Sequence, residues 1–299
     1  MDKQYRKYKL VLDKDTNATG LYRLKALRDF NNVKAGDLGG FVDKETNLSH
    51  EGNCWIYDDA VVRKSTILDN ALIRGKAIVT DSYICDEVLI IDDARVTSSE
   101  IRDNVFIHQK PNIIKCVVKN NVDILGTGNL INSSIFNCCR IYGNGIIINC
   151  SFRDTVRIDN EGELKHVIAN HAVFIKGNVY IDGYVHLYDS VVLNGSFEIH
   201  DSIDIKKNAI IHSKEDFIIF KNWWSSGRNF IWTRSNNMWN VGCFYGTGKE
   251  LIKKAHLDND DSCREYTRIV NYVEDILDKD KPKLVRLFNH IKRNIKLFI

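Results

Sequence analysis

Several features that define other protein classes are missing from this sequence. Its longest apolar runs are only a few residues, and Met1 to Lys7 lead into no signal-peptide core, so we expect no membrane span and a cytoplasmic protein. The formal net charge of +3 is too small to indicate nucleic-acid binding by itself. With 44% hydrophobic residues, the 299-residue chain has ample material for a folded core.

Motifs for catalysis and metal binding are missing as well. The eight cysteines form no CxxC pair, which argues against a zinc site or a disulfide framework. The sequence has no P-loop, GxGxxG, GxSxG or cluster of metal ligands. We therefore expect no bound metal and no resident cofactor.

What the chain does contain is a repeat that returns at every seventeenth position. Three columns of apolar residues recur at steps of six, five and six, and each coil must stack on its neighbours to bury them. Three apolar positions per cycle imply three short strands and three corners, so the sequence predicts a mainly β protein built as a three-sided parallel β-helix. The columns are Ile56, Ile73, Ile90, Ile107, Ile124, Ile141, Ile158 and Ile175; Val62, Val79, Val96, Ile113, Leu130, Ile147, Leu164 and Ile181; and Ile67, Ile84, Ile101, Val118, Ile135, Phe152 and Ala169.

Smaller residues accompany these columns. The position two before each apolar residue points the same way in an extended strand, and it is mostly Ala, Ser, Val, Gly or Cys. Four cysteines share these positions and are interpreted as buried spacers. After Ile181 the repeat slips by one residue and continues more loosely through Leu187, Val192, Ile199, Ile205 and Ile211.

The repeat divides the chain into three parts. Residues 1–50 do not repeat and are interpreted as a cap on the open end of the β-helix at 51–220. Residues 221–299 contain four tryptophans from Trp223 to Trp239, a hairpin pattern that turns at Ser235 to Asn237, and capping boxes at 247–250 and 262–265. We expect a hairpin followed by two or three helices, the last of which carries a basic, amphipathic tail at 281–299.

Three stretches together resemble a known family. They are Leu21 to Phe30, the turn Gly36-Asp37-Leu38-Gly39-Gly40-Phe41-Val42, and the coils built on Ala-x-Val/Ile; Val241 to Thr247 is also similar to a closing module of that family. The chain resembles hexapeptide-repeat proteins of phages and prophages, many of which are labelled acyltransferases. The resemblance implies a left-handed coil, a homotrimer and a bacterial host cytoplasm. The coils here are one residue shorter than those of the acyltransferase relatives, so their active site is not carried over.

One face of the predicted β-helix is apolar on the outside. An exposed apolar strip usually marks an interface, either between subunits or with another part of the same chain. Both alternatives stay open: a seam of the homotrimer, or a surface covered by the chain's own termini. The strip consists of Trp55, Tyr57, Leu72, Leu89, Ile91, Phe106, Leu125 and Tyr142.

Two groups of residues are candidates for ligand binding. Arg140, Arg157 and Lys176 follow one another at about one coil each, a spacing suited to a phosphate or carboxylate, although Asp123 and Asp159 are alternative ion-pair partners. In the carboxy-terminal module, Trp232, Arg234 and Trp239 combine stacking surface with a guanidinium group. The alternative for these tryptophans is a place in the core.

The interpretation as an enzyme depends on a suitable histidine, because hexapeptide acyltransferases use one as a general base. His166 and His171 flank Ala169, the smallest residue of the columns, and are the best candidates, but no loop of the kind that clasps the acyl carrier interrupts the coils. The remaining histidines are interpreted as isolated surface or corner residues: His50, His108, His186, His200 and His212.

These observations lead to a non-enzymatic, oligomeric binding protein of phage or prophage type. Its ligand would be a nucleotide-type signal or another anionic small molecule, sequestered against host defence, or a host protein. The alternatives are an acetyl-CoA-dependent hexapeptide acyltransferase and, through the Trp-Arg hairpin and the basic tail, a nucleic-acid-binding protein.

Overall fold

The computed structural model describes residues 6–12, 20–126, 203–221, 227–258 and 260–279, together with the backbone of the strands between 129 and 194 and the side chains of 191–193. The chain divides into two units, Met1–Asp216 and Phe217–Ile299. Each unit is described separately below.

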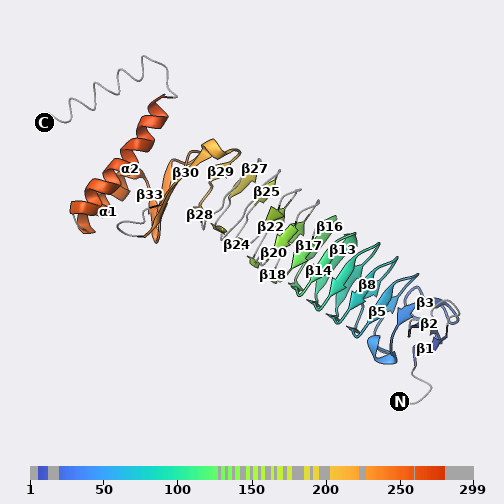
Figure 1. The fold of residues 1–299 in the computed structure, drawn as a ribbon. Helices are drawn as coiled ribbons and strands as arrows, with labels where there is room; N and C mark the ends of the chain where they lie inside the picture. The colour runs from blue at the N-terminus through green and yellow to red at the C-terminus, as the bar shows by residue number, and fades with distance from the viewer. Residues whose placement is uncertain are drawn as a thin grey trace, which may run out of the picture. The chain divides into compact units, whose positions relative to one another are not determined.

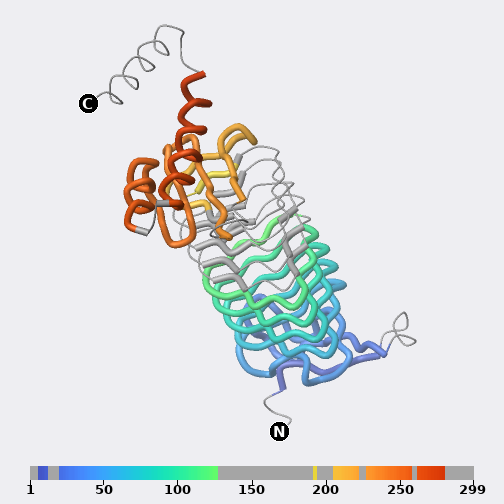
Figure 2. The backbone as a smooth tube through the Cα atoms, turned by 60° about the vertical axis from the view of Figure 1, so that its left-hand side comes forward, coloured from blue at the N-terminus to red at the C-terminus, as the bar shows by residue number. Residues whose placement is uncertain are grey.

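The first unit is the predicted three-sided parallel β-helix, and its coils stack regularly (Figure 1, Figure 2). Three sheets of ten, ten and nine strands form its sides. The first sheet contains β1 (Tyr8–Val11), β2 (Tyr22–Ala26), β3 (Leu38–Val42), β5 (Val61–Arg63), β8 (Ile78–Thr80), β11 (Arg95–Thr97), β14 (Asn112–Ile114), β17 (Asn129–Ile131), β20 (Ile146–Ile148) and β23 (Glu163–Leu164). The second contains β4 (Trp55–Ile56), β7 (Leu72–Ile73), β10 (Glu87–Ile90), β13 (Asn104–Gln109), β16 (Val122–Gly126), β19 (Cys139–Ile141), β22 (Val156–Ile158), β25 (Phe174–Lys176), β27 (Val192–Asn194) and β29 (Ile210–Ile211). The third contains β6 (Thr66–Ile67), β9 (Tyr83–Ile84), β12 (Glu100–Ile101), β15 (Val117–Lys119), β18 (Ser134–Phe136), β21 (Ser151–Arg153), β24 (Val167–Asn170), β26 (Val185–Tyr188) and β28 (Ile203–Lys206).

Strand register confirms the apolar columns. On the second sheet Ile73, Ile90 and Ile107 are Cα partners in successive coils, and all three are fully buried. Because adjacent residues of a strand face opposite ways, the flanking residues form the outer faces. The predicted spacers Cys54 and Cys116 are buried too.

The one-residue slip is also confirmed, and the register locates it. Ile158 pairs with Ile175, a step of seventeen positions, whereas Ile175 pairs with Leu193 and Leu193 with Ile211, each a step of eighteen. The column therefore continues through Leu193, and the expectation that Val192 would continue it was wrong by one position. On the third sheet the step of eighteen begins at β24, where Ala169 pairs with Leu187, so the coils are one residue longer from β24 onward.

The corners depend on left-handed backbone and on aspartate. Each corner has a residue with positive φ in register from coil to coil, for example Asp69, Asp86 and Asp103 at φ of 57°, 64° and 68°. The carboxylate of one coil accepts a hydrogen bond from the corner N–H of the next: Asp86 N–H donates to Asp69 (3.3 Å), and Asp103 N–H donates to Asp86 (3.2 Å). Aspartate tolerates this conformation and bonds nearby backbone, which explains why it recurs at the corners.

Serine performs the equivalent task inside the β-helix. The N–H groups of Ser82 and Ser99 donate to the hydroxyl of the serine one coil earlier, at 3.0 and 3.1 Å. Each hydroxyl also donates to a carbonyl of its own coil, as Ser82 does to Thr80 at 2.8 Å. Buried backbone N–H groups that lie off the sheet ladder are thus satisfied by side chains.

We predict that Ser82→Ala destabilises the first unit by about 1–3 kcal/mol, because it leaves the buried N–H of Ser99 without its acceptor. The measurement is chemical denaturation followed by far-UV circular dichroism. Thr97→Val, an isosteric change on the half-buried outer side of β11, is the matched control. Equal stability of the two variants would show that the serine column does not contribute.

A buried lysine closes the amino-terminal end. Lys7 is fully buried, and its ammonium group donates to the carbonyls of Glu51, Gly52 and Cys54 at 3.2, 3.3 and 2.9 Å. Burial lowers the pKa of Lys7. These three carbonyls belong to the start of the first coil, so the lysine satisfies acceptors that no earlier coil could reach.

The second unit is an antiparallel sheet with two helices. The sheet order is β30 (Phe217–Lys221), β31 (Asn229–Thr233), β32 (Met238–Val241) and β33 (Phe244–Gly246), followed by α1 (Gly248–Asp258) and α2 (Asp260–Lys279). The predicted hairpin is β31–β32, and the capping box at the start of α1 is confirmed: Glu250 N–H donates to the Thr247 hydroxyl (3.3 Å) and Thr247 N–H to the Glu250 carboxylate (2.8 Å). The second box at 262–265 was wrong, because α2 begins at Asp260. The basic tail at 281–299 lies outside the described residues.

Candidate functional site

A histidine and an aspartate meet on the outer face of the second sheet. His108 on β13 and Asp123 on β16 approach to 3.1 Å between Nε2 and Oδ1, and both are partly buried, with side-chain exposures of 19% and 37%. Phe106 lies two residues before His108 and so shares its face. The two rings stack at a centroid distance of 4.1 Å and an interplanar angle of 9°.

The contact with Asp123 indicates which ring nitrogen of His108 carries the proton. An ionised carboxylate only accepts hydrogen bonds, so Nε2 carries the proton that it donates to Asp123. In the neutral ring Nδ1 is then the unprotonated nitrogen, with a lone pair available to accept a proton. A base oriented by a carboxylate is the arrangement that general-base catalysis requires.

The sequence interpretation of His108 as an isolated residue was wrong. His108 and Asp123 are separated by fifteen positions, two fewer than one coil, so they face each other diagonally across neighbouring strands. The sequence repeat could have predicted this contact. When the outward residues of the second sheet are aligned coil by coil, His108 and Asp123 fall on adjacent strands, two positions apart in register.

The apolar strip is interrupted and partly covered. Trp55 is 1% exposed and packs edge-on against Tyr8 and Phe30 at centroid distances of 6.2 and 5.3 Å. Of the two alternatives for the strip, cover by the chain's own terminus is therefore confirmed at this residue, and its assignment to a subunit interface was wrong. Farther along, Leu72, Leu89 and Phe106 are Cα partners on successive strands and remain half-buried.

A second row of outward residues runs beside the first. It passes through Tyr57, Arg74, Ile91, His108 and Leu125, and the Arg74 guanidinium lies 4.6 Å from the centre of the Tyr57 ring. Ile91 and Leu125 are half-buried. Arg74 and His108 therefore interrupt the predicted strip, and Tyr142 lies outside the described residues. Whether the strip forms the seam of a trimer stays a prediction.

The cationic row has two members in register. Arg140 is the Cα partner of Asp123, and Arg157 is the partner of Arg140. The next position is Phe174, whereas Lys176 lies two residues farther and pairs with Asn194, so its place in the row was wrong. The side chains of these cations, and His166 and His171 altogether, lie outside the described residues.

The tryptophans of the second unit are core residues. Trp232 and Trp239 are 0% and 2% exposed and pack with Phe230 and Val241, and the Trp232 indole N–H donates to Asn237 at 2.8 Å. Arg234 lies over Trp232, with its guanidinium 5.9 Å from the ring centre. Because both rings are buried, their prediction as a stacking surface for a ligand was wrong.

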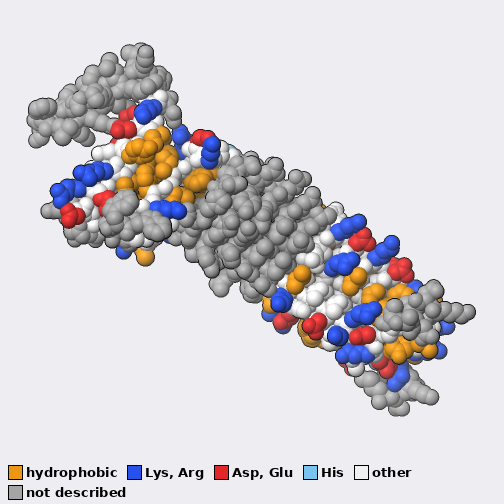
Figure 3. All heavy atoms as spheres, viewed as in Figure 1, with side chains coloured by type: hydrophobic (Ala, Val, Ile, Leu, Met, Phe, Trp, Pro, Cys, Tyr) orange, Lys and Arg blue, Asp and Glu red, His pale blue; other side chains and the backbone are white. Residues whose placement is uncertain are grey.

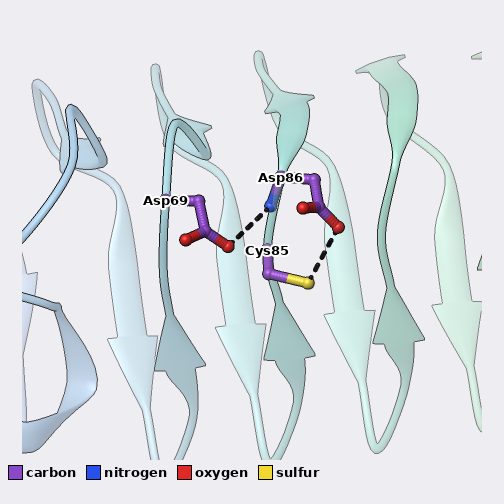
Figure 4. A group of neighbouring side chains, drawn as sticks. All are labelled: Asp69, Cys85 and Asp86. Carbon is purple, nitrogen blue, oxygen red and sulfur yellow. Dashed lines mark hydrogen bonds between the residues drawn. The ribbon is translucent and has the colours of Figure 1, made fainter.

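Asp69, Cys85 and Asp86 form a group whose donor atoms all lie within 4.8 Å of one another (Figure 4). These donors are already engaged in the corner ladder, because Asp69 and Asp86 accept backbone N–H groups and the Cys85 thiol donates to Asp86 at 3.2 Å. Burial, followed by the bond to Asp86, raises the pKa of the Cys85 thiol to about 11. A protonated thiol is a poor metal ligand, so we interpret the group as structural.

We predict that iodoacetamide alkylates Cys85 about 100-fold more slowly than an ordinary thiol at pH 8, because the thiolate is scarce when the pKa is raised. The measurement is peptide mass spectrometry over a pH series, with exposed Cys243 as the internal comparison. An unfolded thiol ionises near 9.0 and the folded one near 11, so this group's contribution to stability is full below pH 9 and is lost as the pH rises to 11. Equal rates for both cysteines at pH 8 would contradict this.

Comparison with known proteins adds one short match. Forty-two residues, 14% of the chain, are 52% identical to the "Uncharacterized acetyltransferase YdcK" of Escherichia coli (strain K12), and they cover 13% of that protein. No protein-family model matches the chain. Because the match spans far less than two thirds of the relative, it transfers no activity by itself. Among the described residues, no helix has the length and hydropathy of a membrane span.

Proposed function

We propose that the protein is an acyltransferase that uses acetyl-CoA, with His108 as the general base. The observation that carries the proposal is the His108–Asp123 pair on the outer face of a parallel β-helix. A relative named as an acetyltransferase supports it. From β24 onward the coils have the length found in the acyltransferase relatives, although His108 itself lies in the shorter coils before them.

The reaction follows from the orientation of the imidazole. The acceptor nitrogen or oxygen attacks the thioester carbonyl while Nδ1 of His108 takes its proton, so that a new bond to carbon forms. The carbon–sulfur bond then breaks, and the proton passes to the departing thiolate. Asp123 stabilises the imidazolium that exists between these two transfers.

In this proposal the phosphates of acetyl-CoA bind to Arg140 and Arg157. Strands in neighbouring coils are about 4.8 Å apart, so Arg140 and Arg157 lie two and three coils from His108, about 10 and 14 Å along the axis. Two arginines in register suit bidentate recognition of phosphate. In this proposal a homotrimer covers the Leu72–Leu89–Phe106 row and encloses the site.

Arg140 and Arg157 are Cα partners on neighbouring strands, and this arrangement also supports a second candidate function. A non-enzymatic binding protein of phage or prophage type would use the same two arginines to sequester a nucleotide-type signal. Binding of a nucleotide by pure protein, without release of thiol from acetyl-CoA, would favour this function over acyl transfer.

We predict that His108→Gln lowers kcat for acetyl transfer by about 100-fold to 10,000-fold, the usual contribution of a general base. Thiol release from acetyl-CoA is measured against a panel of amines, alcohols and sugars. Asp123→Asn should lower kcat less, because the ring remains, held in place by Phe106. His256→Gln on the exposed side of α1 is the control.

The same assay includes His166→Gln and His171→Gln. If either of these abolishes turnover while His108→Gln does not, the base is assigned to the wrong histidine. If the unaltered protein releases no thiol with any acceptor of the panel, acyl transfer itself is contradicted.

A further inference from the structure

The surroundings of His108 are unusual for a base that would act on a polar acceptor. Ile91 and Leu125 occupy the same row as His108, one coil to either side, and Phe106 stacks on its ring. Leu89 is the Cα partner of Phe106 and extends this apolar surface by one coil. Hydrocarbon thus borders the imidazole on three sides.

Few polar groups remain for a substrate at this place. Of the described outward residues that border His108 on these two rows, Asp123 is the polar one, and its Oδ1 is engaged by His108. At the adjoining corner, Lys110 and Asp93 pair with each other at 3.2 Å, and the Asp92 carboxylate accepts the Gln109 N–H at 2.8 Å. Arg74, farther along the row, lies over Tyr57. Each of these described charged groups therefore already has a partner, either another polar group or, for Arg74, the Tyr57 ring.

A sugar or polyol would lose its hydration on this surface without gaining replacement hydrogen bonds, which costs free energy for every hydroxyl that is buried unpaired. An alkyl or aryl group would instead gain by leaving water. The surface therefore favours acceptors with an alkyl or aryl group over polyols, through hydrophobic contact and not through hydrogen bonds to hydroxyl groups.

We infer that the acceptor is a primary amine or alcohol carried on an alkyl or aryl body, and that Ile91 and Leu125 determine this specificity. The inference rests on the proposed acyl transfer and adds the class of acceptor. The hydrocarbon next to the nucleophile lies against Ile91, Leu125 and Phe106, and the nucleophile itself meets Nδ1 of His108.

The test compares hexylamine, ethanolamine and glucosamine as acceptors of acetyl-CoA in the thiol-release assay. For the unaltered protein we expect kcat/KM for hexylamine to exceed that for the two polar amines by about 10-fold or more, the size of effect that hydrophobic contacts give. Leu125→Asn should reduce this preference to about 3-fold or less, through a higher KM for hexylamine.

The matched control is Ile114→Asn, a half-buried aliphatic residue on β14 of the first sheet. Like Asn112 two residues earlier, Ile114 is half-buried at an outward position of the same strand. Ile91→Asn provides a second variant beside the base. Far-UV circular dichroism verifies that each variant is folded.

The outcomes separate the two claims. Turnover that depends on His108 but favours ethanolamine or glucosamine overturns the acceptor class and leaves acyl transfer standing. A hexylamine preference that survives both Ile91→Asn and Leu125→Asn overturns the assignment of these residues. Absence of thiol release with all three amines and with the wider panel overturns both claims.

Discussion

The first unit depends on one constraint. Backbone N–H and C=O groups that point along the axis of the β-helix must form hydrogen bonds with the neighbouring coil. The sheets satisfy this constraint along the three sides. Where the chain turns, the carboxylates of Asp69 and Asp86 and the hydroxyls of Ser65 and Ser82 accept the N–H groups that the ladder misses. At the open end the Lys7 ammonium does the same for carbonyls. The result is a frame in which the strand register repeats from coil to coil, and on the face seen in Figure 3 its described surface carries charged and hydrophobic side chains near one another.

The regular stacking of the strands holds the His108–Asp123 pair in a defined geometry. On a flexible surface a histidine and an aspartate in contact would be an ordinary, weak ion pair. Here neighbouring strands hold both residues and Phe106 stacks on the ring, so the ring has a defined place, and the hydrogen bond to the Asp123 carboxylate favours the tautomer with its proton on Nε2. Catalytic groups on rigid elements are held more closely than groups on loops.

Much of this fold could be predicted from the sequence, because the repeat spacing directly reports which residues stack. The columns, the small spacers such as Cys54 and the slip near Ile181 all follow from counting residues. The site was harder to predict, because its pair is diagonal: His108 and Asp123 occupy different positions of the repeat and share no column. The burial of Trp55, Trp232 and Trp239 could not be inferred from composition, since a buried aromatic and an exposed one have the same local sequence pattern.

The proposed function places acyl transfer from acetyl-CoA at the outer face around His108. A crystal structure of the full chain with coenzyme A tests it most directly, through the distance from the ligand's sulfur to the imidazole of His108. If His108 is the base, the sulfur lies within reach of Nδ1, directly or through one water, and the phosphates lie toward Arg140 and Arg157. A sulfur atom beside His166 or His171, or a ligand on another face, would contradict it.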